Sequence, residues 1–164
     1  MVRMSLAALL CLVLLVVGCG QSADEKAIEK QIEKSTGSDA TVDLSEKGMN
    51  ISGKTEEGEF TVSTGNEVAI PKDFPEDIFI YHPSKTTMAM NVPEGYSLTL
   101  TTSDNKADVL SAYSREMTDK GWSQVTSMET GAGSMLVYEK GERSASISLA
   151  ASDKELQISV TASK

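Results

Sequence analysis

Hydrophobic and polar positions alternate with a period of two over most of the chain, and two stretches of helical period interrupt the alternation. A period of two is typical of strands with one buried face, whereas apolar residues three and four positions apart are typical of amphipathic helices. We therefore predict an α+β fold. An N-terminal helix plus a three-stranded meander is followed by a ββαββββ antiparallel sheet packed on one helix.

The first of these units covers residues 23–66. Its helix carries Ile28 and Ile32 on one face and has a plausible stop at Gly37. The thin apolar stripe favours a surface helix lying on a small sheet, with an oligomerisation or partner helix as the alternative. Three alternating segments between residues 40 and 64 predict the meander, with turns at 46–48 and 57–58. This core is small, so we expect the first unit to be supported by contacts with the rest of the chain.

A connector with three prolines, residues 67–85, leads to the second unit, residues 86–164. Its apolar residues Phe74, Ile78, Phe79 and Ile80 are expected to pin it to the core. A hairpin turns at residues 93–95, with Met88, Met90 and Val92 on one face of its first strand and Leu98 and Leu100 on one face of its second.

A helix capped by Asp104 or Asn105 is expected to run to about Lys120. Gly121 then supplies a left-handed residue, and Trp122 is expected to fold back on Met117 in a Schellman motif. Four strands come after this motif, near 122–129, 134–140, 143–150 and 155–162.

Short polar side chains occupy one face of the last two predicted strands. They alternate with apolar residues that the helix must cover. The candidate interaction face consists of Ser144, Ser146, Ser148, Gln157, Ser159 and Thr161. Such a flat, uncharged face is suited to an envelope protein or a polysaccharide, and the alternative is a solvated sheet face with good β propensity.

The N-terminal 18 residues have the layout of an export signal: Arg3 precedes an unbroken apolar segment from Leu6 to Val17. This segment is shorter than the roughly 20 residues that span a bilayer. Gly18 and Cys19, preceded by branched aliphatic residues, resemble the lipobox of bacterial lipoproteins. That resemblance implies cleavage between Gly18 and Cys19 and acylation of the Cys19 sulfur. Residues 19–22 then form the lipidated cysteine and a short tether.

By the same resemblance, Gly20 in place of Asp implies sorting to the outer membrane of a Gram-negative cell. Burial of acyl chains contributes about 0.8 kcal/mol per methylene, so two or three chains hold a protein on a bilayer without an apolar body. An uncleaved membrane anchor and an ordinary signal peptide are the alternatives for this segment.

The charge and cysteine content of the chain after the predicted signal exclude several kinds of function. The net charge is −9, and cleavage would make it one unit more negative by removing Arg3. An acidic body is poorly suited to nucleic acid, whose affinity for proteins comes largely from Lys and Arg. Once Cys11 has left with the signal and Cys19 is acylated, no thiol remains for a disulfide, a metal or a nucleophile.

Two other chemical interpretations are weak. The only histidine, His82, lies near Asp73, Glu76 and Asp77, but it cannot build a multi-histidine metal site within one chain. Asp104, Asn105 and Asp108 suggest calcium, although their spacing is not that of an EF-hand loop and a helix cap explains them better. We expect no cofactor.

Several segments together resemble a group of small uncharacterised bacterial lipoproteins. The resemblance rests on the lipobox, the connector sequence DFPEDI, and the module YSREMTDKGW leading to LVYEKGERSASISL. It implies a location and a fold, and it transfers no catalytic residue. At the level of the fold alone, a sheet holding one helix is similar to domains in lipoprotein accessories of outer-membrane assembly machinery.

The sequence thus predicts a non-enzymatic, lipid-anchored protein of the cell envelope whose body is an interaction or structural module. The alternative is a periplasmic small-ligand binder or enzyme that uses a groove between the two units. That alternative predicts a deep pocket holding a carboxylate with a raised pKa.

Overall fold

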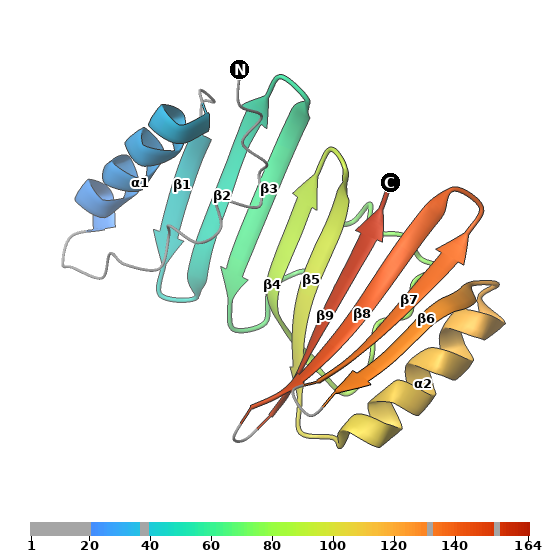
Figure 1. Ribbon diagram of the computed structural model, residues 1–164. Helices are drawn as coiled ribbons and strands as arrows, with labels where there is room; N and C mark the ends of the chain where they lie inside the picture. The colour runs from blue at the N-terminus through green and yellow to red at the C-terminus, as the bar shows by residue number, and fades with distance from the viewer. Residues whose placement is uncertain (1–20, 37–39, 131–132, 153–154) are drawn as a thin grey trace.

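A computed structural model describes residues 21–36, 40–130, 133–152 and 155–164. Within these residues the chain forms two helices and nine strands, as the α+β prediction requires (Figure 1). The helices are α1 (Gln21–Thr36) and α2 (Lys106–Asp119). The strands are β1 (Ala40–Ser45), β2 (Gly48–Thr55), β3 (Gly58–Gly65), β4 (Lys85–Val92), β5 (Gly95–Thr102), β6 (Ser123–Thr130), β7 (Gly133–Lys140), β8 (Arg143–Ala151) and β9 (Leu156–Ser163).

All nine strands belong to one antiparallel sheet in the order β1-β2-β3-β4-β5-β9-β8-β7-β6. The predicted separation into a meander and a second sheet is therefore wrong at the level of topology. Residues 61–64 of β3 pair with residues 88–91 of β4, which joins the two units edge to edge. This pairing supplies the support that a small meander needs, because isolated small sheets are only marginally stable.

The second helix begins and ends as its sequence predicts. The Asn105 side chain accepts a hydrogen bond from the Asp108 backbone N–H at 3.0 Å, which is the expected cap. At the other end Gly121 has a φ of 83°, and the Trp122 and Gly121 N–H groups donate to the carbonyls of Met117 and Thr118. These two bonds define a Schellman motif, which places Trp122 back against the helix end.

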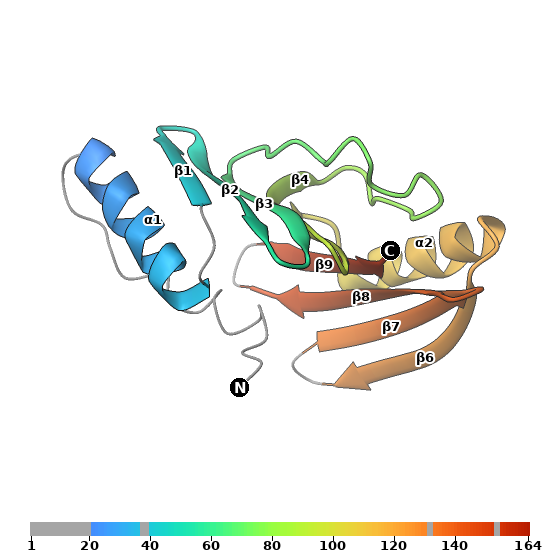
Figure 2. The same cartoon turned by 90° about the horizontal axis from the view of Figure 1, so that it is seen from above.

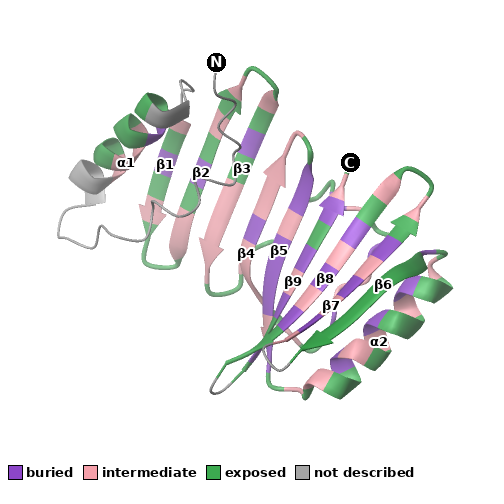
Figure 3. Ribbon diagram, viewed as in Figure 1, coloured by how far each residue is buried: buried purple, intermediate pink, exposed green. Residues whose placement is uncertain are grey.

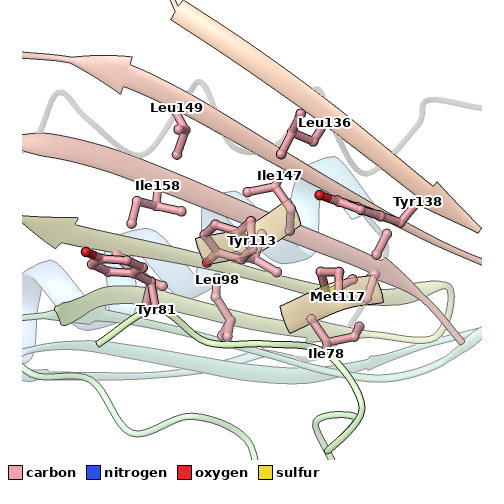
Figure 4. Packing of buried hydrophobic residues seen from close by; sticks show 14 of the residues in the cluster. Ile78, Tyr81, Leu98, Tyr113, Met117, Leu136, Tyr138, Ile147, Leu149 and Ile158 are labelled. Carbon is pink, nitrogen blue, oxygen red and sulfur yellow. The ribbon is translucent and has the colours of Figure 1, made fainter. Parts of the chain in front are cut away.

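One face of strands β5, β9, β8 and β7 is covered by α2 and by the connector, which lie on the same side of the sheet (Figure 2). Four connector residues pack there as predicted: Phe74 and Ile78 are buried, and Phe79 and Ile80 are partly buried. Tyr81, which was not predicted, is also buried in this cluster. Tyr113 and Met117 of α2 pack among Leu98, Ile147 and Ile158 of the sheet (Figure 4). We call this side of the sheet the covered face.

The first helix packs on the opposite side of the sheet. Val42, Ile51, Val62, Met90 and Ser97 follow one another across strands β1 to β5 as directly paired residues, which share a face. Leu98, the neighbour of Ser97, is on the covered face. Since Ile32 of α1 packs with Val42, Ile51 and Phe60, α1 and α2 lie on opposite faces of one sheet.

The apolar face of the sheet is therefore on one side in strands β1–β3 and on the opposite side in strands β5, β9, β8 and β7. Over β1–β3 the buried apolar residues pack with α1, and over β5, β9, β8 and β7 they pack with α2 and the connector. Figure 3 shows buried residues in both parts of the sheet. Among the described residues, no helix or connecting segment covers the α1 side of the sheet over the remaining strands. We call that uncovered side, from β4 to β6, the open face.

Candidate interaction face

The centre of the open face is an array of short polar side chains on three adjacent strands. Register places Ser97 of β5 opposite Thr161 of β9, and Thr161 opposite Ser146 of β8. In the next row, register places Ser159 of β9 between Thr99 of β5 and Ser148 of β8. We call this array the hydroxyl face. Its members are Ser97, Thr99, Thr101, Ser144, Ser146, Ser148, Ser159 and Thr161, together with the amide of Gln157, and Thr99 is itself buried.

The six residues predicted from sequence all lie in this array, on the neighbouring strands β8 and β9. Sequence reasoning missed Ser97, Thr99 and Thr101 of β5. Their alternation with Leu98 and Leu100 was visible, but the pairing of β9 with β5 joins segments about 60 residues apart. No local pattern reveals that pairing, so the width of the array was underestimated.

Apolar side chains border the hydroxyl face on both sides. On one side Met88 pairs with Thr99 and Met90 with Ser97. On the other side Met135 pairs with Ser148 and Val137 with Ser146. Because directly paired residues share a face, these side chains point the same way as the hydroxyls, while Leu98 and Leu100 point to the covered face.

The open face is hollowed near the β4–β5 turn. A shallow depression of about 270 Å³ lies there. Its lining includes Met90, Val92, Ser97, Ser146 and Thr161. Its floor thus combines methionine and valine side chains with hydroxyl groups, which suits a ligand with both apolar and hydrogen-bonding groups.

The interior between the sheet and α2 is filled with side chains. Leu98, Tyr113, Met117 and Tyr138 are fully buried between the sheet and α2. A second depression of about 240 Å³ lies at the start of α2, between residues 103–106 and the end of β8. Both depressions open to the surface, so neither is a deep pocket.

A cluster of charges fixes the connector over the covered face. Both carboxylate oxygens of Asp77 accept hydrogen bonds from Arg143, and the Lys140 Nζ donates to Oδ2 at 2.8 Å. The Trp122 Nε1 donates to the Asp77 carbonyl at 2.7 Å, and the Arg143 guanidinium lies 5.0 Å from the Trp122 ring. The hydrogen bond from Arg143 is the main cause that lowers the Asp77 pKa to about 2, against the opposing effect of burial.

Asp73 ties the other end of the connector to the hairpin. Its carboxylate accepts hydrogen bonds from the Tyr96 hydroxyl and the Asn91 amide, each at 3.0 Å to Oδ2. The bond from Tyr96 is the largest influence on Asp73, and the pKa of this carboxyl is lowered. Asp73 and Asp77 are therefore engaged in structural contacts rather than gathered around the exposed His82.

Nearby acids also have structural partners. Asp104 accepts a hydrogen bond from the Tyr81 hydroxyl at 2.6 Å, and this bond raises the Tyr81 pKa to about 12. Asn105 and Asp108 form the helix cap rather than a calcium loop. Within the described ranges no three His, Cys, Asp or Glu side chains are grouped so as to hold a metal ion.

The predicted lipidation site lies outside the described residues. Gly18 and Cys19 fall in the segment 1–20, of whose structure nothing is described, and the same holds for Gly37. Among the helices formed by the described residues, none has the length and apolar character needed to cross a membrane.

Comparison with known proteins gives one match. The model of a family described as START domain-like matches residues 84–163, just under half of the chain. This segment begins just before β4 and extends through β9, so it contains the whole hydroxyl face and α2. No curated protein and no solved structure matches the chain.

Proposed function

We propose that this chain is a lipid-anchored protein of the cell envelope whose folded body is a non-enzymatic binding module. In this proposal the acylated Cys19 holds the body on a membrane, and the hydroxyl face with its methionine borders receives the partner. The partner is another envelope protein or a polysaccharide.

The observation that carries the proposal is that one side of strands β4, β5, β9, β8 and β7 has no covering element among the described residues. The covered face of the same strands is filled by α2 and the connector. The apolar cluster under α1 lies on the other side over β1–β3 and reaches Val92 at the end of β4. A domain that needed only stability would gain by covering both sides, since burial of apolar surface contributes about 25 cal/mol per Å². The partly exposed methionine borders therefore favour a surface kept free for binding.

Methionine is also suited to this task. Its unbranched, polarisable side chain adapts to different partner shapes, and methionine is used often at surfaces that bind other molecules. Hydroxyl groups between the methionines supply donors and acceptors without net charge. The match of residues 84–163 to a START domain-like fold, which is typically ligand-binding and non-catalytic, supports a binding role for this part of the chain.

The alternative places a small ligand or substrate in a groove between the two units. Two observations weigh against it: β3 pairs directly with β4, and the described depressions are shallow. Moreover, the carboxyls Asp73 and Asp77 have lowered pKa values, whereas the alternative requires a raised one.

Site-specific photocrosslinking in cells tests both parts of the proposal. A photoreactive amino acid replaces the exposed Thr161 on the hydroxyl face of the full chain, once with Cys19 intact and once with Cys19→Ala. Labelled fatty acid is supplied in the same cultures. We expect fatty-acid label and a reproducible protein or glycan adduct with Cys19, and loss of the label together with most of the adduct in Cys19→Ala.

The matched control carries the photoreactive residue at Ser52, which is exposed on β2 but on the other side of the sheet. It should give no such adduct. Equal labelling of both Cys19 forms would overturn the anchor. Equal adducts from positions 161 and 52, or none from position 161, would overturn the binding face.

A further inference from the structure

The depression on the open face has an acidic side chain at each of two borders. Glu94, in the β4–β5 turn, belongs to its lining. Glu139 of β7 pairs directly with Ser144, which also belongs to the lining, so the Glu139 side chain is on the open face beside the depression. Both glutamates are exposed. The hydroxyl face between them is uncharged, so these two carboxylates determine the sign of the local charge.

Neither glutamate forms an ion pair in the described part of the chain. Nearby cations are held on the other side of the sheet. Lys140 and Arg143 contact Asp77 over the covered face. The Nζ of Lys164 lies 4.7 Å from the ring centroid of Tyr96, a residue of the covered-face core. The two carboxylates are therefore available to cations of another molecule.

Each border combines its carboxylate with apolar side chains. At the Glu94 border, Met90 and Val92 line the depression. At the other border, Val137 precedes Glu139 by two residues on β7, so both side chains lie on the open face. Lysine and arginine pack their aliphatic stems along apolar surface and keep the charged group in water. Such a side chain fits each border, with its stem on the apolar residues and its cation beside the carboxylate.

The separation of the two borders gives the spacing of the two cations. Strands β5, β9, β8 and β7 are neighbours in this order, so three interstrand steps, roughly 14 Å, lie between the β4–β5 turn and Glu139 (Figure 1). An extended peptide advances about 3.4 Å per residue and covers this length in about four residues. A segment with basic residues four positions apart can thus reach both carboxylates while its central part lies over the hydroxyl face.

We propose that the partner of the open face is a protein segment with two basic residues about four positions apart, which pair with Glu94 and Glu139 across the hydroxyl face. This inference rests on the proposed binding face and narrows its two partner classes to a protein. Complementary charge gives such a segment specificity that a neutral or anionic polysaccharide lacks. Exposed ion pairs contribute little individually, so contacts with the methionine, valine and hydroxyl side chains supply the remaining affinity.

Amide NMR spectra of the isotope-labelled full chain in a non-ionic detergent test the proposal. The probe is a pentapeptide, capped at both termini, with lysine at both ends and alanine, serine and alanine between them. We expect saturable shifts at Ser97, Ser144 and Thr161 at about 0.01 M salt, and much smaller shifts when both lysines are acetylated. Binding should weaken at about 0.15 M salt, because the screening length falls from about 30 Å to about 8 Å.

Two double variants locate the contacts. Glu94→Gln combined with Glu139→Gln should weaken binding of the basic peptide about threefold or more, as expected for the loss of two exposed ion pairs. The matched control, Asp43→Asn combined with Glu59→Gln, removes two exposed carboxylates from the opposite side of the sheet and should weaken binding far less. Dispersed amide spectra like that of the wild type show that both variants fold.

Three results would each overturn the inference: no saturable shifts with the basic peptide, equal shifts with its acetylated form, or equal weakening by the two double variants. Saturable shifts with neutral maltohexaose and none with the peptide would also overturn it, but they would leave the binding face in place with a polysaccharide partner. The crosslinking from position 161 fails only when the binding face itself is wrong, so the two experiments separate the two claims.

Discussion

Asp77 joins three segments that are distant in sequence. Its side chain is about a quarter exposed and holds Lys140 and Arg143 from the two sides of the β7–β8 turn, while its carbonyl accepts from Trp122. Hydrogen bonds to charged groups contribute about 1.5–3 kcal/mol each in net terms when they are well formed. The sequence showed that the connector must be pinned by apolar residues, but it could not reveal this ion cluster, because the cationic partners lie more than 60 positions away.

We predict that Asp77→Asn lowers the free energy of unfolding by about 1–3 kcal/mol, because it leaves Arg143 and Lys140 without their shared carboxylate. Urea unfolding of the full chain in detergent measures the change. Asp43→Asn on the exposed side of β1 is the control and should change stability by less than about 0.5 kcal/mol. An equal effect of the two substitutions would contradict the role of Asp77.

The same cluster predicts a dependence on pH. Since the folded pKa of Asp77 is lowered from 3.8 to about 2, its contribution is fully present above pH 4 and is lost as the pH falls from about 4 toward 2. The stability difference between the wild type and Asp77→Asn should therefore shrink over that window. A difference that stays constant down to pH 2 would show that another group is responsible.

Helix α1 shows how an element acquires a role that its own sequence does not reveal. Its stripe of Ile28 and Ile32 predicted that it lies on a small sheet, and the structure shows it packed on strands β1–β3 of the nine-stranded sheet. No role was predicted for its acidic residues from the sequence. Only the position of β1 at the sheet edge gives Glu25 and Glu29 their function as hydrogen-bond acceptors, so the prediction had to stop at the apolar stripe.

We predict that Glu25→Ala combined with Glu29→Ala speeds amide hydrogen exchange at Val42 and Leu44. Loss of about 1.5 kcal/mol of protection corresponds to roughly a tenfold faster exchange. Glu33→Ala, on the exposed side of the same helix, controls for a general change in helix stability and should leave both rates unchanged. Similar exchange in all three proteins would contradict the capping of the β1 edge.

Local elements were the most predictable part of this chain. Turns at glycine, the Asn105 cap and the Gly121–Trp122 motif each depend on residues a few positions apart, so their signals are contained in short segments. Strand order was not predictable in this way. The insertion of β9 between β5 and β8 depends on which distant apolar faces bury one another, and it is this insertion that widens the hydroxyl face from two strands to three.

In the whole molecule, α1 covers one side of the sheet at the β1 end, and α2 and the connector cover the opposite side over β5, β9, β8 and β7. The consequence is an open face that carries Met88, Met90 and Met135 around the hydroxyl array, while Met117 is buried on the other side. These methionines are built-in probes of whether the open face is occupied, because oxidation of a methionine depends on its access to the oxidant.

The most direct test of the account is therefore hydroxyl-radical footprinting of the unmodified protein, read by mass spectrometry, in intact envelopes and after purification in detergent. Because a bound partner would shield the open face, we expect Met88, Met90 and Met135 to be oxidised several-fold more slowly in the envelope than after purification. Met117 should be slow in both samples, as an internal control for unfolding. Equal oxidation of Met88, Met90 and Met135 in the two samples would contradict the claim that this face binds a partner in the cell.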